Sequence, residues 1–407
     1  MRNQRYLVAE PEGFSDDPAA RWRLLDAATP HEVGGWDRLA WGRSFYVAAD
    51  WLRFADTDRV AHSRYLGLSV GGRLVAALSS HWVPDEVDAG YVAARTLEVP
   101  SGTPSVDRVL TLGGRRGFLS GVLVAPDIDR TAAAGHLAEL IRRASGAASA
   151  QGAAWWWPYL ISSDADFVMA AGSRLGSTAG PGVHLVGADC VIDVVGATVD
   201  DHVACLPTRQ RRTNFRREER RFIDSGLEIR RVSLAEDWPR LGPLLAAVQQ
   251  KYGHRQSADE FKARLRRQGE HLAPRAVVFG CFDGDIIVGF ALAYQWGDEL
   301  ALRVVGFDYE RLPGADEYAQ LAVHAPLRYC YQHGLRRLHL GTESYEAKCR
   351  RGARPRPLWA VTSLPGPDSG SVARTARRIA ASMPTHESEF FAAQVDHSWR
   401  CWAAFGS

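Results

Sequence analysis

A lysine within the segment LGTESYEAKCRRG, residues 340–352, is the first residue whose type suggests chemistry. Of the 49 basic residues in the chain only three are lysines, Lys251, Lys262 and Lys348, and all others are arginines. This bias is typical of a GC-rich genome, in which arginine replaces lysine wherever either cation serves. A retained lysine indicates a need for a compact ammonium with three donors rather than a planar guanidinium. Lys348 is therefore a candidate catalytic cation, and the alternative is an exposed lysine in an arginine-rich loop.

The densest charge cluster lies between residues 209 and 221, which include seven arginines and two glutamates. At about 100° per residue, four of these arginines share one face of a predicted helix: Arg209, Arg212, Arg216 and Arg220. Phe215 and Phe222 lie on a neighbouring face and would anchor the helix. Aligned guanidinium groups can follow a phosphate backbone or hold a multiply charged donor. The alternative is a solvated face that Glu218 and Glu219 partly neutralise.

Motifs of other chemistries are missing from the sequence. It has no HExxH, P-loop or GxGxxG pattern. None of the 13 histidines has a partner at metal-ligand spacing, and the six cysteines stand alone, so we predict no metal site and no disulfide. His324, on a predicted helix before a closing strand, is the one histidine that we consider as a catalytic base, with a core or surface role as the alternative.

The overall composition is that of a globular protein. With 407 residues, 46% hydrophobic and 24% charged, the chain has the length of two or three domains. A formal net charge of +2 excludes a global field for polyanions, so any nucleic-acid contact must be local, and we expect no DNA binding. The sequence shows no apolar stretch of membrane-span length and no signal-peptide pattern, so we expect a cytoplasmic protein.

The elements that must position these residues follow the same order twice. Residues 65–160 predict a hairpin that turns at Gly71-Gly72, then a strand, a helix and another strand. Residues 276–341 repeat this order, with the hairpin turning at Asp283-Gly284 and the helix ending at Gly334. The sequence therefore predicts a mixed α/β (α+β) fold in two domains, each with a mixed twisted sheet flanked by helices. We predict domains over residues 1–183 and 184–364 and a tail, 365–407, that packs on the body.

Two segments carry a resemblance to a known family. PTRQRRTNFRREERRFIDSGLEIRRV, residues 207–232, opens the second domain with a basic helix, and YCYQHGLRRLHLGTESYEAKCRRG, residues 329–352, closes it. With the doubled architecture, they resemble the second half of the Fem-type and BioF2-like tandem acyltransferases of the GNAT superfamily. In that group a basic helix leads into the second domain, and a Lys-x-x-x-Gly loop, matched here by Lys348 and Gly352, follows the last strand.

This resemblance implies transfer of an acyl or aminoacyl group from an activated ester or thioester to an amine. Fem-type members use aminoacyl-tRNA, and their loop lysine steadies the oxyanion of the tetrahedral intermediate, which implies that role for Lys348. We expect Lys348→Met to slow turnover while leaving the fold intact. Donor phosphates would meet the four aligned arginines together with Arg350 and Arg351. A substrate pocket would include Tyr309, Glu343 and Tyr345.

The chain departs from members that use acetyl-CoA, which carry Arg-x-x-Gly-x-Gly or Ala before a helix that holds the pyrophosphate. The first-domain stretch VLVAPDIDRTAAAGHL has Arg130 and Gly135 but an alanine run between them. The second-domain stretch lacks the pattern and has Asp316 and Glu317 where a phosphate would lie. Both departures favour aminoacyl-tRNA over acyl-CoA.

We therefore predict an amide-forming acyltransferase that moves an aminoacyl group from aminoacyl-tRNA to the amine of a small natural-product or peptidoglycan-like acceptor. The first alternative is an N-acyltransferase that uses acyl-CoA or a carrier-protein thioester. The second is a non-catalytic tRNA- or nucleotide-binding protein on a degenerate GNAT pair. In each catalytic case the donor is a co-substrate, and no cofactor is expected to stay bound.

Overall fold

The computed structural model describes residues 22–58, 60–99, 106–150, 152–176, 180–253 and 255–403. The first half contains β1 (Trp22–Ala27), β2 (His62–Val70), β3 (Arg73–Trp82), β4 (Val109–Leu112), β5 (Leu123–Val124), β6 (Ala154–Ile161) and β7 (Gly182–Asp193). Its helices are α1 (Trp36–Ala40), α2 (Ala49–Ala55), α3 (Ala93–Thr96), α4 (Arg130–Ala150) and α5 (Ser162–Gly172). The turn residues Gly71 and Gly72 both have positive φ, as the predicted hairpin requires.

The second half repeats this order. Its strands are β8 (Glu228–Val232), β9 (Ala276–Asp283), β10 (Ile286–Trp296), β11 (Glu299–Phe307), β12 (Arg337–His339) and β13 (Arg354–Thr362). Its helices are α6 (Val199–Cys205), α7 (Arg209–Asp224), α8 (Leu234–Lys251), α9 (Ala258–Leu272), α10 (Glu317–Ala319), a π turn (Gln320–His324), α11 (Ala325–Gln332) and α12 (Tyr345–Cys349). The tail forms α13 (Ser369–Ala380) and α14 (Thr385–Ala403).

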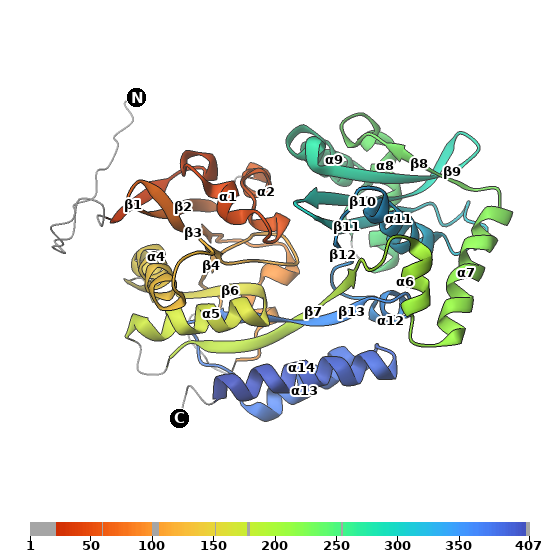
Figure 1. Cartoon of the computed structure of the whole chain (residues 1–407). Coiled ribbons are helices and arrows are strands. Elements are labelled where there is room, and N and C mark those ends of the chain that lie inside the picture. The colour runs from red at the N-terminus through yellow and green to blue at the C-terminus, as the bar shows by residue number, and fades with distance from the viewer. Residues whose placement is uncertain are drawn as a thin grey trace.

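One 13-stranded sheet runs through both halves (Figure 1). Its order is β1-β2-β3-β4-β6-β13-β7-β12-β11-β10-β9-β8, with β5 paired to β3. The halves exchange their last strands, because β7 pairs with β12 of the second half and β13 pairs with β6 of the first. In Figure 1 these two strands run together beneath both lobes, paired antiparallel from Arg354 opposite Val191 to Thr362 opposite Gly182. The exchange therefore ties the halves together.

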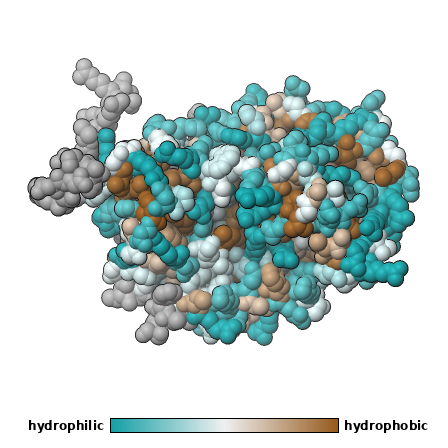
Figure 2. Space-filling view, in the orientation of Figure 1, coloured by the Kyte–Doolittle hydropathy of each residue, from teal (hydrophilic) through white to brown (hydrophobic). Residues whose placement is uncertain are grey.

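Helices cover both faces of the sheet. One face packs on α1, α2, α8 and α9 around aromatic residues such as Trp51, Phe290 and Tyr294. The other face packs on α4, α5, α11 and the tail, where Trp402 meets Trp359 edge-on at 4.7 Å between ring centroids. Among the described helices none is both long and apolar enough to cross a membrane. Figure 2 shows hydrophilic side chains mixed with small apolar patches over one face of the molecule.

The predicted fold class is confirmed, since both halves are mixed sheets flanked by helices in the same order. The predicted boundaries at 183 and 364 stay a prediction, because the exchanged strands make the sheet continuous across them. Residues 1–21 lie outside the described residues.

Candidate functional site

The sheet opens where two parallel strands diverge. β11 and β12 pair only from Glu299 opposite Arg337 to Ala301 opposite His339. β11 then continues to Phe307, whereas the chain after His339 turns into residues 340–344. We call the space between β11 after Ala301 and residues 340–344 the wedge. The turn is held on β7, since the amide of Leu340 donates to Cys190 O at 2.8 Å and that of Cys190 to Gly341 O at 3.1 Å.

Lys348 reaches from α12 back to the wall of the wedge. Its Nζ donates to the carbonyl oxygens of Thr342 at 2.6 Å and Gly341 at 3.2 Å. The residue is only 5% exposed, so it is not the surface lysine of the alternative hypothesis, and burial lowers its pKa. Glu343 and Ser344 both have positive φ, a conformation that costs free energy outside glycine. The two bonds from Lys348 stabilise this turn and leave one N–H of the ammonium free for a ligand.

A buried histidine joins two carboxylates at the base of the wedge. His339 Nδ1 lies 2.7 Å from Asp189 Oδ2, and its Nε2 lies 3.0 Å from Glu299 Oε2. Burial lowers the pKa of His339, but Asp189 and Glu299 raise it, and the result is about 9. The imidazole is therefore a cation at neutral pH that donates to both acids. Asp189 Oδ1 is buried and has no hydrogen-bond partner among the described residues.

Residues 113–120 of the first half, which follow β4, close the wedge from the other side. Arg303 of β11 donates through Nη2 to the carbonyl oxygen of Arg116 at 3.0 Å. A Cβ at Gly341 would lie 3.2 Å from the Phe118 ring, so glycine permits this close approach. Tyr46, Phe118, Glu299 and His339 line a cavity of about 10 Å³ between the halves. It has room for about one water molecule, so a larger ligand would require the cavity to widen.

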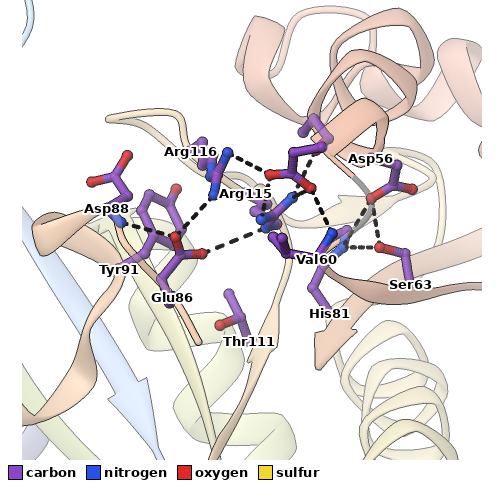
Figure 3. Close-up of polar contacts among 12 residues, drawn as sticks. Asp56, Val60, Ser63, His81, Glu86, Asp88, Tyr91, Thr111, Arg115 and Arg116 are labelled. Carbon is purple, nitrogen blue, oxygen red and sulfur yellow. Dashed lines mark hydrogen bonds and ion pairs between the residues drawn. The ribbon is translucent and has the colours of Figure 1, made fainter. Parts of the chain in front are cut away.

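An ion-pair network holds residues 113–120 in place (Figure 3). Arg115 is fully buried and donates to the two carboxylate oxygens of Asp58 at 3.2 and 2.8 Å. Arg116 donates to Glu86 at 3.1 Å and also pairs with Asp58. Figure 3 shows both arginines joined to Glu86, with Asp88 beside Glu86. The acids of this network are thus already paired, and the Arg116 backbone is fixed where Arg303 binds it.

Helix α7 has the anchors that the sequence predicted. Thr208 caps it by accepting from the amide of Arg211 at 3.2 Å, and Phe215 and Phe222 are buried. Of the four aligned arginines, Arg209, Arg216 and Arg220 are exposed, while Arg212 is half-buried and donates to Leu206 O at 2.6 Å. Three of the four predicted donor-binding arginines are therefore accessible.

The inner side of α7 is bonded to the segment that carries Lys348. Arg211 donates to Cys349 O at 3.3 Å, and Arg351 holds both oxygens of Glu218 at 2.8 and 2.9 Å. His324 Nε2 lies 3.0 Å from Glu218, its ring stacks on Phe215, and burial lowers its pKa. His324 and Arg351 therefore fix α7, and the structure does not bring His324 to the wedge.

The remaining predicted residues divide into two groups. Glu343 and Tyr345 border the wedge, and the Tyr345 hydroxyl accepts from the amide of Ala188 at 3.3 Å, with burial raising its pKa to about 12. Tyr309 is 41% exposed and lies 4.1 Å, ring centroid to Nζ, from Lys251 at the end of α8. Arg350 is exposed and pairs with Glu346 at 2.6 Å. Only the first group shares the wedge with Lys348.

Carboxylates of the chain accept from backbone amides at the start of two helices, a type of position that can otherwise bind phosphate groups. At the start of α10, Glu317 Oε1 accepts from the amides of Gly314 and Ala315 at 2.9 Å each. At the start of α4, Asp129 Oδ2 accepts from the amide of Ala132 at 3.0 Å. The described residues include no cluster of three ligands suited to a metal ion.

Sequence reasoning missed five residues around the wedge: Tyr46, Asp189, Glu299, Arg303 and His339. A signal was present for Asp189, because it is a charge within the otherwise apolar run of β7, and a buried charge in a strand often marks a functional site. The other four lie on β11, on β12 and in a short turn before α2, where charged and aromatic residues are common, so they give no local signal.

Comparisons with known proteins agree with this fold. Residues 209–348, from the first residue of α7 to the wedge lysine, match the family model described as an acetyltransferase (GNAT) domain. The crystal structure of FemX is similar to this chain with a TM-score of 0.58 and 11% identity, over 84% of this chain and 97% of that one. The C-terminal domain of a protein assigned as a lysylphosphatidylglycerol synthetase from Agrobacterium fabrum is similar with a TM-score of 0.52 and 10% identity, over 85% of this chain and 95% of that one. No curated protein sequence matches the chain. The predicted resemblance is confirmed, and at these identities the likeness to solved structures concerns the fold.

Proposed function

We propose that this protein transfers an aminoacyl group from aminoacyl-tRNA to the amine of a small molecule, because residues 209–348 match the model of a GNAT acetyltransferase domain and the fold is similar to that of FemX. One observation carries the choice of donor. Glu317 accepts from the two amides at the start of α10, so the place where the pyrophosphate of coenzyme A would bind is already occupied by a carboxylate.

The position of Lys348 supports a role in the chemical step. The ammonium group of the acceptor first loses one proton to solvent. The resulting amine nitrogen attacks the ester carbonyl carbon, a C–N bond forms, and the carbonyl oxygen becomes an oxyanion. The C–O bond to the terminal ribose then breaks, and a second proton from the attacking nitrogen ends on that ribose oxygen. An ammonium fixed by Gly341 and Thr342, with one N–H free, stabilises the oxyanion more than the neutral ester.

Helix α7 supports a donor with a phosphate backbone. Arg209, Arg216 and Arg220 are exposed on it, and Arg211 and Arg351 fix it to the segment of Lys348. Phosphate contacts on this helix would therefore hold the donor in a defined position relative to the wedge.

The second candidate function is transfer of an acyl group from a thioester donor, because the matching family model is that of acetyltransferases. An acidic carrier protein could also use the exposed arginines of α7.

The test compares donors directly. First, RNA that co-purifies with the protein would be extracted and sequenced. The protein would then be incubated with a mixture of amines and one of two donors: tRNA charged with labelled amino acids, or acetyl-CoA. Amide product from charged tRNA, lost in Lys348→Met, supports the proposal. Thiol release from acetyl-CoA alone would assign the thioester donor, and tRNA binding without product from either donor would indicate a non-catalytic protein.

A further inference from the structure

A groove of about 620 Å³ opens on the second half of the molecule, at the end of α7. The last turn of α7, the strand β8 and the helix α11 border it, and the buried rings of Phe222 and Phe279 lie at its base. No strand of the described chain pairs with the outer edge of β8, which ends the sheet. Ligand sites of proteins have volumes of about 300–1,000 Å³, so the groove has room for part of a ligand.

Arg231 of β8 is fixed in this groove without an acidic partner. Its guanidinium carbon lies 5.1 Å from the ring centroid of Phe279 and 5.0 Å from that of Tyr329. The Tyr329 ring is held in turn, because its hydroxyl donates to Gln295 at 2.8 Å. The one hydrogen bond of Arg231 to described residues runs from Nε to Val278 O at 3.0 Å, so both Nη atoms are free to donate. A planar guanidinium held in this way suits a phosphate group.

The charges around the groove favour an anion. Its lining residues include three arginines and one glutamate: Arg230, Arg231, Arg328 and Glu228. Glu228 pairs with Arg230 at 2.7 Å, and Glu219 of α7 pairs with Arg328 at 2.7 Å. Asp224 is exposed at the end of α7 and does not line the groove. The two acids nearest the groove are therefore paired with other arginines, and the charge of Arg231 is left in excess.

The groove continues the line of exposed arginines on α7. Arg209, Arg216 and Ile223 are spaced seven residues apart, so at about 100° per residue they lie within about 40° of one another. Both arginines are exposed, and Ile223, which is 66% exposed, lines the groove. The first turn of α7 is bonded to the segment of Lys348 through Arg211, and in Figure 1 the helix runs from beside α12 toward β8. A ligand that follows this face therefore passes from the region of Lys348 to the groove.

The length of α7 sets the size of such a ligand. From Arg211 to Ile223 the helix rises by about 18 Å, at about 1.5 Å per residue. A nucleic-acid duplex rises by about 3.4 Å per base pair, so it covers this distance in roughly five base pairs. An RNA whose 3′ end lies at the wedge therefore reaches the groove through its base-paired stem.

We propose that the groove binds the stem of the donor RNA and that Arg231 holds a phosphate group of its backbone. This inference rests on the proposed function and names a second contact for the same donor. Phosphate contacts fix the position of a nucleic acid without reading its sequence, so the groove would select donors by length rather than by sequence. A second copy of this chain is a poor occupant, because antiparallel pairing of Glu228–Val232 with itself would place Arg230 opposite Arg230.

The experiment is filter binding of two uncharged RNA hairpins to the full chain, both with the single-stranded 3′ end of tRNA. The long hairpin has about twelve base pairs and reaches the groove, whereas the short one has about four and does not. We expect the parent chain to bind the long hairpin at least tenfold more tightly than the short one. Arg231→Gln should weaken the long hairpin at least fivefold, reduce its slope of log K against log salt by about 0.9, and leave the short hairpin unchanged.

Two further variants locate the contact. Ile223→Glu places a carboxylate at the border of the groove and should weaken the long hairpin alone. Arg240→Gln is the matched control and should change neither hairpin. Arg240 is an exposed arginine of α8 that also lies over an aromatic ring, 5.7 Å from the centroid of Phe282, but it does not line the groove. Ile223 and Arg231 are both exposed, so their variants are expected to fold.

Three results would overturn the inference. They are equal losses in Arg231→Gln and Arg240→Gln, equal losses for both hairpins in Arg231→Gln, and tighter binding of a polyglutamate peptide that depends on Arg231, which would assign the groove to an acidic protein. Transfer from charged tRNA with unchanged hairpin binding in Arg231→Gln would remove this inference and leave the proposed function standing. Binding of the long hairpin that depends on Arg231, without transfer from charged tRNA, would remove the proposed transfer and leave the groove as an RNA site. No binding of either hairpin would remove both.

Discussion

The strongest physical prediction concerns the proton on His339. Its pKa is about 9 in the folded chain, against about 6.5 in an unfolded one. The folded state therefore holds an extra proton in this interval, and the stability it contributes is full below about pH 6.5 and is lost as pH rises through about 9. Between pH 6.5 and 8.5 the free energy of unfolding should therefore fall by about 2 kcal/mol more in the parent chain than in a His339→Gln variant. Urea unfolding at pH 6.5, 7.5 and 8.5 measures this loss.

Other groups also titrate in this window, so the parent chain is compared with His339→Gln, in which they are unchanged. Burial lowers the pKa of five histidines, to about 4 for His81 and His184, and all five bind fewer protons near pH 6.5 in the folded chain than in the unfolded one: His81, His136, His184, His202 and His324. Unfolded cysteines are about half ionised at pH 8.5, which sets the upper limit. Proton NMR of the parent chain should show one histidine that titrates near pH 9. The same pH dependence of stability in the parent and in His339→Gln would refute the charged imidazole between Asp189 and Glu299.

Three further predictions follow from the wedge and from α7. Lys348→Met removes the hydrogen-bond donor of two carbonyl groups, and an unsatisfied buried acceptor costs about 1–3 kcal/mol, so Tm should drop and turnover should fall by roughly 10²–10³. Sequence alone suggested that the fold would stay intact. Lys348→Arg should restore neither Tm nor turnover, and an unchanged Tm in Lys348→Met would contradict the two hydrogen bonds. Arg216→Glu with Arg220→Glu should reduce the slope of log K against log salt for tRNA, measured by filter binding, by about 0.7–0.9 per lost contact; an unchanged slope would make α7 a solvated face. Gly341→Ala should lower the free energy of unfolding in urea more than Gly334→Ala, because both have positive φ but only the first would meet Phe118; equal losses would exclude that contact.

Local pattern was enough for the order of elements. Hairpin turns, helix ends and the apolar period of strands depend on neighbouring residues, so the doubled order and both Phe anchors of α7 were readable. The scarcity of lysine pointed to Lys348 because the type of residue at a single position can be read without knowing its spatial neighbours. Its two partners, Gly341 and Thr342, are also near in sequence.

Pairing between distant segments was not readable. β7 and β13 are both buried strands, and an apolar strand has the same pattern whichever neighbour it pairs with, so the exchange left no trace in sequence. Asp189 and His339 are 150 residues apart, and their contact exists only because β7 pairs with β12. His324 was considered as a possible base because its hydrogen-bond partner, Glu218, lies 106 residues away, and the sequence around His324 does not indicate this contact.

The repeat also explains why the wedge is open in the second half and not in the first. β4 and β6 pair in parallel over three residues, as β11 and β12 do, so the first half has an equivalent opening. That opening is filled by its own residues: the Trp157 indole donates to Ser120 Oγ at 2.9 Å, and a Cβ at Gly113 would lie 2.0 Å from the indole nitrogen. Residues 113–120 therefore fill the opening of the first half and close the wedge of the second half. The first half has therefore become a wall of the site, and residues 184–403 alone would retain Lys348 but lose Arg116 and Phe118, which border it.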